Sequence, residues 1–254
     1  MAKKRNIQRI MRGLLAGVAV LGLALLGLLG WRWMAALPLE RVAFAHVQHA
    51  DTTALLELAQ VDTIEAMLDV DPALVADRVQ RHPWVASASA SRLPTGTLSI
   101  DVYERMPVAL VLDAQGHPDY FLDRDGFAMP LVKGAVYDVP LLRGFREKYH
   151  PVQPAQDAAV RELLVALANA DDATDALISE LDIQPSGEIV LRTTPVAGRG
   201  SLPVSLGREA FADRLARLRM FWHRAVLAQP EKTFTLIDLR YNGQVVTREE
   251  TASQ

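Results

Sequence analysis

The side chains that could do chemistry in this chain are few, and they do not form a familiar site. His46 and His49 are three residues apart. In a predicted strand this spacing places them on opposite faces, so we interpret them as two solvated histidines rather than a metal pair. The other histidines are scattered along the chain, and no His-Glu-x-x-His motif occurs. The sequence therefore predicts no metal site.

Two short loops resemble parts of binding motifs without completing them. Asp123-Arg124-Asp125-Gly126 resembles the start of a calcium loop, but the third acidic ligand and the closing glutamate are absent. A β-turn is therefore predicted there. Gly198-Arg199-Gly200 resembles part of a dinucleotide fingerprint, but Pro203 follows it, which favours a loop between strands.

The chain also lacks the usual catalytic nucleophile motifs. It has no cysteine, which excludes thiolate nucleophiles, thiolate metal ligands and disulfides. Neither a Gly-x-Ser-x-Gly motif nor a Walker A motif occurs. We therefore predict a binding protein and not an enzyme, with no catalytic residues, no cofactor and no small-molecule substrate.

An apolar segment near the N-terminus predicts a membrane anchor. Residues 13–37 form a largely apolar stretch whose one charge is Arg32. At about 1.5 Å per residue this stretch can cross a hydrocarbon core of about 30 Å, and Trp31 and Trp33 suit the membrane interface. Five basic residues precede it, and such flanks stay in the cytoplasm. We predict a cytoplasmic tail at 1–12, a transmembrane helix at 13–37 and an extracytoplasmic remainder.

A cleavable signal peptide and a buried core helix are the alternatives to an anchor. The apolar region of a signal peptide is usually about 7–15 residues long, and this one is longer.

All 30 acidic residues but only 21 of the 27 basic residues follow residue 37, so the outer part has a formal net charge of −9. Because binding to nucleic acid needs a basic surface, an acidic outer part argues against such a partner.

The first outer segment has the pattern of a small β-α-α-β-β unit. Asp51 and Asp71 are good helix N-caps, Pro72 suits a first helical position, and Pro83 ends the second helix. Alternating apolar and polar residues predict strands, two of which flank the turn Pro94-Thr95-Gly96. The predicted elements are a strand at 41–47, helices at 54–58 and 72–82, and strands at 84–93 and 98–104.

The second outer segment predicts a mostly antiparallel β domain with flanking helices, so the fold class is α+β. The predicted strands are 108–112, 119–122, 177–183, 188–194, 233–241 and 244–248, and the predicted helices are 157–169 and 207–228. Asn242-Gly243 lies between the last two strands and predicts a tight hairpin. The last helix has an apolar stripe, and its other faces carry Arg208, Arg214, Arg217 and Arg219.

Several motifs occur in a fixed order along the chain. They are Pro38-Leu39-Glu40-Arg41-Val42, Arg81-His82-Pro83-Trp84-Val85, Arg92-Leu93-Pro94, residues 98–109, residues 121–126, Leu206-Gly207 with Arg214-Leu215, and residues 235–241. Behind an anchor of this polarity, the series resembles the bacterial FtsQ/DivIB cell-division family. The resemblance implies a POTRA domain at 38–106 and an FtsQ-type β domain at 107–248, and a disordered tail is expected at 249–254. The structural motif residues of the POTRA region are Pro83, Trp84, Val85, Pro94, Glu104 and Pro107.

The resemblance implies a function without catalysis. Proteins of this family link early and late cell-division proteins and bind FtsB and FtsL, which controls septal peptidoglycan synthesis. It implies a single-pass protein of the inner membrane, located at the division septum, whose domains are periplasmic. Its POTRA domain is expected to bind other divisome proteins. An envelope protein with a POTRA domain that acts in protein transport or as a chaperone is the alternative, as is an anchored envelope enzyme.

The resemblance also implies a place where FtsB binds. In the family, a partner strand adds to the exposed edge of the last strands, and an Arg-Tyr pair contributes. The matching residues are Arg240 and Tyr241, with Leu239, Asn242 and Val245 beside them. An unpaired edge offers backbone groups to a new strand, and an arginine can hold a partner carboxylate. The alternative is that Tyr241 only packs on the sheet and Arg240 is solvated. One departure is that Gln244 follows Asn242-Gly243, where the family often has an aromatic residue.

Overall fold

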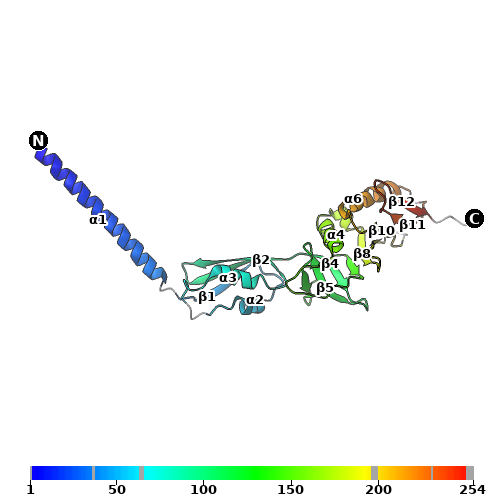
Figure 1. The fold of residues 1–254 in the computed structure, drawn as a ribbon, viewed down its shortest axis with the longest axis horizontal. Helices are drawn as coiled ribbons and strands as arrows, with labels where there is room; N and C mark the ends of the chain where they lie inside the picture. The colour runs from blue at the N-terminus through cyan, green and yellow to red at the C-terminus, as the bar shows by residue number, and fades with distance from the viewer. Residues whose placement is uncertain (1, 36–37, 63–65, 196–199, 230, 250–254) are drawn as a thin grey trace, which may run out of the picture. The chain divides into compact units, whose positions relative to one another are not determined.

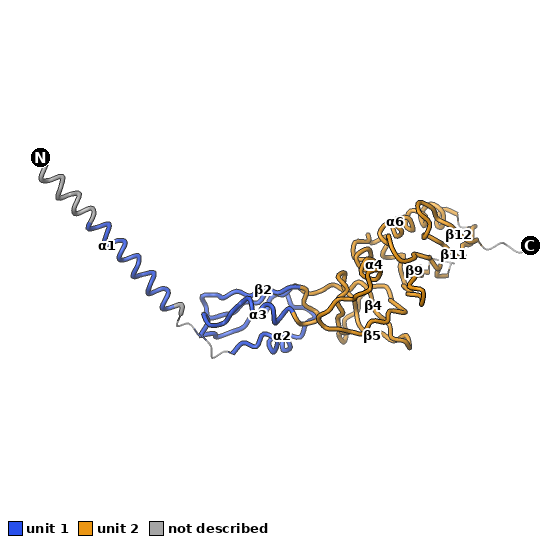
Figure 2. The backbone as a smooth tube through the Cα atoms, viewed as in Figure 1, with its two compact units in different colours: residues 1–80, 87–103 blue, residues 81–86, 104–254 orange. Residues whose placement is uncertain are grey.

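The computed structural model describes residues 2–35, 38–62, 66–195, 200–229 and 231–249. The chain divides into two compact units (Figure 2). Unit 1 comprises residues 1–80 and 87–103, and unit 2 comprises residues 81–86 and 104–254. Each unit is described by itself.

A single long helix, α1 (Ala2–Ala35), opens the chain (Figure 1). Its residues Leu14–Trp33 form a 20-residue apolar stretch with a mean hydropathy of 2.3, and their side chains are exposed. At about 1.5 Å per residue, such a stretch has the length of a hydrocarbon core. The end of the predicted span, residues 36–37, lies outside the described residues.

The globular part of unit 1 has the predicted β-α-α-β-β order. Its elements are β1 (Arg41–Ala45), α2 (Thr52–Ala59), α3 (Pro72–Val79), β2 (Val85–Leu93) and β3 (Thr97–Glu104). Strand β3 is central in the order β1-β3-β2 and runs parallel to β1. The predicted caps are confirmed, because the carboxylate of Asp51 accepts from Thr53 N at 3.0 Å and that of Asp71 from Ala73 N at 2.9 Å.

Unit 2 is built on a nine-stranded mixed sheet in the order β12-β11-β10-β9-β8-β7-β4-β5-β6. Its strands are β4 (Pro107–Leu112), β5 (Pro118–Asp123), β6 (Ala128–Pro130), β7 (Leu141–Arg143), β8 (Ile178–Ile183), β9 (Ile189–Thr193), β10 (Pro203–Gly207), β11 (Phe234–Asp238) and β12 (Val246–Glu249). Neighbouring strands are parallel at β4–β7, β7–β8 and β10–β11, and the other pairs are antiparallel. The predicted α+β class is confirmed.

Helices complete the core of unit 2. They are α4 (Ala158–Ala168), α5 (Asp172–Asp175) and α6 (Phe211–Phe221), which continues as a π-helical turn at Trp222–Val226. Leu163 and Leu164 of α4 and Phe211 and Leu218 of α6 are fully buried in one cluster with residues of the sheet. This packing fixes α6 beside the strands that end the chain.

The start of the last helix was predicted four residues too early. Residues 203–207 form strand β10, which pairs antiparallel with β9 and parallel with β11. Helix α6 begins at Phe211, whose backbone N–H donates to Glu162 of α4 at 3.2 Å. A strand of five residues that ends in a glycine carries little sequence signal. Pairing with two neighbours therefore decides its conformation.

The tight hairpin predicted at Asn242-Gly243 is wrong. Strand β11 ends at Asp238, which pairs with Val246 at the start of β12, so seven residues, 239–245, connect the two strands. A turn does form there, because Gln244 N donates to Tyr241 O at 3.3 Å and Gly243 has a φ of 68°. The longer loop exists because its carbonyl groups bond to α6 instead of to the opposite strand, as described below.

Candidate functional site

The acidic turn at residues 123–126 is a structural turn, as predicted. Asp123 Oδ1 accepts from the backbone N–H groups of Asp125 at 2.9 Å and Phe127 at 2.8 Å. Its Oδ2 accepts from Arg105 at 2.6 Å, and Gly126 N–H donates to Asp123 O. Both carboxylate oxygens are therefore engaged within the fold. Across the described ranges, no three His, Cys, Asp or Glu side chains are grouped to hold a metal ion.

His46 and His49 are not strand residues. Strand β1 ends at Ala45, and His46 adopts a φ of 63° just after it. The His46 ring stacks on Tyr103 with centroids 6.1 Å apart, and its Nδ1 lies 3.8 Å from Asp101 Oδ1. The strand geometry assumed for this pair is wrong. His46 is exposed at the surface, and His49 is half-buried.

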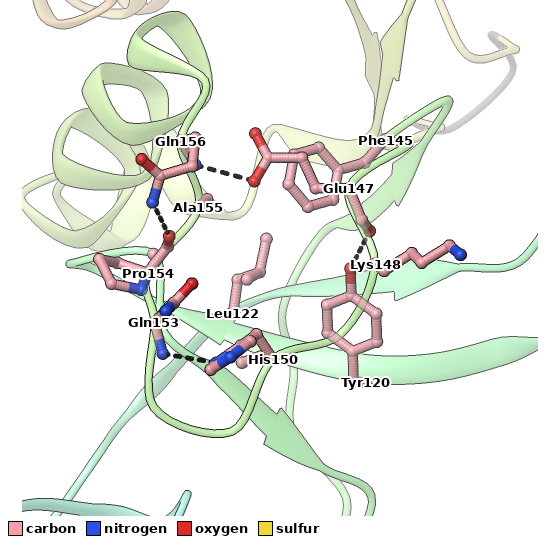
Figure 3. A pocket seen from close by; sticks show the side chains of 12 residues that line it. Tyr120, Leu122, Phe145, Glu147, Lys148, His150, Gln153, Pro154, Ala155 and Gln156 are labelled. Atoms are coloured by element: carbon pink, nitrogen blue, oxygen red, sulfur yellow. Dashed lines mark hydrogen bonds between the residues drawn. The ribbon is translucent and has the colours of Figure 1, made fainter.

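A cleft of about 370 Å³ in unit 2 is lined by groups that hold a loop in place (Figure 3). Glu147 accepts from Gln156 N at 2.8 Å and Asp157 N at 2.7 Å, and Tyr120 Oη donates to Glu147 O at 3.0 Å. Burial, with smaller effects from Asp119 and Glu147, raises the pKa of Tyr120 to about 12, so the phenol remains a hydrogen-bond donor. His150 Nδ1 accepts two backbone N–H groups. These polar groups tie residues 147–157 to β5 and to the start of α4.

The predicted partner-binding residues lie at the opposite end of the sheet from β6. Strand β12 is the last strand in the sheet order, and none of the strands in the described residues pairs with its outer edge. Tyr241 is 54% exposed and Asn242 is also exposed, whereas Val245 is half-buried against the core. Leu239 is fully buried in the core of unit 2. Its side chain therefore anchors the loop and has no exposed surface for a partner to contact.

Arg240 is not simply solvated, because two carboxylates hold it. Its Nε lies 3.0 and 3.2 Å from the two carboxylate oxygens of Asp238, and its Nη2 lies 2.7 Å from Asp238 Oδ2. Its Nη1 lies 3.0 Å from Glu188 Oε1 on the turn before β9. Hydrogen bonds from Arg240 hold the pKa of Asp238 below its usual value, against the effect of burial. The guanidinium has five N–H groups, so donors remain for a partner.

Gly207 makes room for this cluster of charged groups. It has a φ of 79°, and a Cβ atom there would lie 2.7 Å from Arg214 Nη1 and 3.1 Å from Arg240 Cγ. Arg214, predicted to lie off the apolar stripe of α6, is nonetheless buried, and its Nη1 donates to Leu206 O. Arg214 also contributes to the lowered pKa of Asp238. Leu206-Gly207, Arg214 and Asp238-Leu239-Arg240, which are distant in sequence, are therefore parts of one site.

Arg217 and Glu188 belong to this site but are absent from the sequence prediction of it. Arg217 of α6 donates to the carbonyl oxygens of Leu239, Tyr241 and Gln244. In the sequence it is one of several arginines on a polar helix face. Nothing in the local sequence around Arg217 indicates that it contacts residues 239–244. The contact is seen only in the folded structure.

The residues predicted to form the structural motif of the POTRA region lie in or beside β2, β3 and β4. Trp84 is buried in unit 2, where its indole N–H donates to Pro130 O on β6 at 3.0 Å and its ring contacts Phe121 edge-on. Val85 is also buried, Pro83 is half-buried, and Pro94 is exposed in the β2–β3 turn. Glu104 ends β3, and Pro107 begins β4.

Comparison with known proteins gives matches over nearly the full length of the chain. A family model described as the POTRA domain, FtsQ-type, matches residues 37–105, and one described as FtsQ/DivIB, C-terminal related, matches residues 106–248. The cell division protein FtsQ of Rhodothermus marinus is 52% identical over 250 residues, which cover 98% of this chain and 90% of the relative. FtsQ of Salinibacter ruber is 46% identical over 237 residues, covering 92% and 91%.

These matches confirm the resemblance that the sequence motifs indicated. FtsQ proteins are non-catalytic proteins of the inner-membrane divisome, which agrees with the one apolar helix of membrane-spanning length that the described residues contain, near the N-terminus. The chain belongs to the FtsQ/DivIB family of cell division proteins.

Proposed function

We propose that this protein is a scaffold that links early and late division proteins at the septum and binds FtsB and FtsL, thereby controlling septal peptidoglycan synthesis. Residues 1–12 lie in the cytoplasm, and 13–37 span the inner membrane. Residues 38–106 form a periplasmic POTRA domain that binds other divisome proteins. Residues 107–248 form the β domain that binds FtsB. Glu249, expected to begin a disordered tail, is the last residue of β12, and residues 250–254 lie outside the described residues.

The observation that carries the proposal is the outer edge of β12, with which no strand of the described part of the chain pairs, beside an exposed tyrosine and a fixed arginine. A terminal strand with free N–H and C=O groups can accept a further strand by β-augmentation. Tyr241 offers a rigid ring with more than half of its surface exposed. Arg240 offers a guanidinium whose position is set by Asp238 and Glu188. Aromatic and arginine side chains of this kind often dominate binding energy.

Replacing the two side chains tests the proposal. The double variant Arg240→Glu, Tyr241→Ala is expected to weaken FtsB binding at least tenfold, since removal of one such side chain costs about 1–2 kcal/mol or more. Binding is measured by pull-down and by titration of the full-length protein in lipid nanodiscs with FtsB from the same organism. Arg124→Glu, the same charge reversal at an arginine that is 56% exposed just after β5, is the matched control and is expected to bind as the native protein does.

Circular dichroism and thermal melting of the variants report whether the fold survives. Normal FtsB binding by a folded double variant would remove the β12 edge from the proposal. In cells, the double variant is expected to produce filaments because septa fail to form.

A further inference from the structure

We propose that Arg217 is a positioning residue for partner binding, which holds the loop 239–245 in the shape that presents Tyr241 and the β12 edge. The inference rests on the proposed function of that edge. Arg217 lies on helix α6 and is not one of the residues predicted to bind the partner.

The guanidinium of Arg217 is the centre of the loop's hydrogen bonding. Its Nη1 donates to Tyr241 O at 2.8 Å and to Gln244 O at 3.0 Å, and its Nη2 donates to Leu239 O at 3.1 Å. Its Nε donates to Asp213 Oδ2 at 3.0 Å, one helical turn earlier. The Arg217 side chain is only 11% exposed, while that of Asp213 is 70% exposed. The Arg217 side chain is therefore largely buried, whereas the carboxylate of Asp213 is in solvent.

Apart from Arg217, the loop is held at Arg240, which bonds to Asp238 and Glu188, by the packing of Leu239 and Val245, and by few backbone bonds. Its start is fixed where Leu239 N donates to Ser205 O at 3.0 Å. After that point, the one bond between backbone groups within residues 239–245, all of which are described, closes the turn from Gln244 to Tyr241 at 3.3 Å. A connection of seven residues is much longer than the two-residue turns that set strand register unaided. Pairing with β11 aligns β12, and the contacts with Arg217 connect the parts of the loop that its own backbone bonds leave unconnected.

Arginine suits this task and lysine does not. The guanidinium is a planar fork with donors in fixed directions, so one side chain reaches three carbonyl groups at once. A lysine keeps the charge, and with it the pairing with Asp213. Its N–H donors all lie on one nitrogen, so it cannot reach three separate carbonyl groups as the guanidinium does. A loop that is already ordered loses less conformational entropy when the partner strand binds, which increases affinity.

The test compares single variants of the full-length protein in lipid nanodiscs, titrated with FtsB from the same organism. Arg217→Lys is expected to weaken binding about tenfold, which corresponds to about 1.4 kcal/mol. Asp213→Asn removes the exposed ion pair and leaves the carbonyl contacts, so it is expected to bind within about twofold of the native protein. Without FtsB, hydrogen exchange in Arg217→Lys is expected to be faster at 239–249 and unchanged in β8 and β9.

Tyr241→Ala, measured in parallel, separates this inference from the proposed function. If Tyr241→Ala weakens binding while Arg217→Lys binds normally, the positioning role is wrong and the edge assignment survives. If neither variant weakens binding, the edge assignment itself is wrong. If exchange in Arg217→Lys rises throughout unit 2, Arg217 is a general stabilising residue, and the inference is overturned.

Discussion

Gly207→Ala is expected to lower the free energy of unfolding of unit 2 by about 2–5 kcal/mol. A left-handed backbone costs a residue with a side chain about 1–2 kcal/mol, and forcing extra atoms into a packed site costs about 1–3 kcal/mol. Both costs apply, because φ is 79° and the new Cβ would lie 2.7 Å from Arg214 Nη1 and 3.1 Å from Arg240 Cγ. Arg214 is buried and its Nη1 donates to Leu206 O, so a shift that makes room for the Cβ would break this bond.

Gly243→Ala is the matched control for this substitution. Gly243 also has a positive φ, of 68°, but a Cβ atom there meets nothing within 4 Å. It therefore bears only the backbone cost, about 1–2 kcal/mol. Urea unfolding of the full-length protein in detergent, followed by the fluorescence of Trp84 and Trp222, measures both variants. Equal losses for the two substitutions would contradict the role given to the space at Gly207.

Asp123→Ala is expected to cost about 3–5 kcal/mol, because it leaves a buried arginine without its partner. The side chains of Arg105 and Asp123 are 10% and 5% exposed, and their charged atoms are 2.6 Å apart. The substitution also removes the acceptor for the N–H groups of Asp125 and Phe127. The Arg105 guanidinium lies 3.8 Å from the centre of the Phe127 ring, so the loss extends to that contact.

Two further variants divide this loss into its parts. Asp125→Ala removes a carboxylate from the same turn, but that side chain is 63% exposed and its nearest cation is 4.0 Å away. It is expected to cost less than about 0.5 kcal/mol. Asp123→Asn keeps an oxygen for the backbone bonds and removes the charge, so an intermediate loss is expected. The same urea titration applies, and a loss for Asp125→Ala that matches Asp123→Ala would contradict the buried-pair explanation.

Local signals in the sequence were sufficient for the first outer unit. The caps at Asp51 and Asp71, Pro72 at a first helical position and the Pro94-Thr95-Gly96 turn each act within a few residues of their own position. Their outcome does not depend on distant contacts, so the β-α-α-β-β order was predictable. The Asp123 turn was predictable for the same reason, since the bonds from its backbone N–H groups to the Asp123 carboxylate span at most four residues.

The C-terminal site was less predictable because distant residues decide its conformation. Asn242-Gly243 is a strong hairpin signal by itself, but Arg217 takes the carbonyl groups that a tight hairpin would pair across the strands. Strand β10 gains its conformation from pairing with β9 and β11. Arg240 is held by Glu188, 52 residues earlier in the chain. Periodicity and spacing within one segment carry no information on such contacts.

Hydrogen exchange of the full-length protein in nanodiscs, with and without FtsB, tests the binding of a partner strand most directly. A strand that adds to β12 must bond to its free backbone groups, so slower exchange is predicted at residues 239–249 when FtsB is present, with little change in β4, β5 and β6. Protection confined to β5 and β6, or to unit 1, would show that FtsB binds elsewhere, and the account of the C-terminal edge would be wrong.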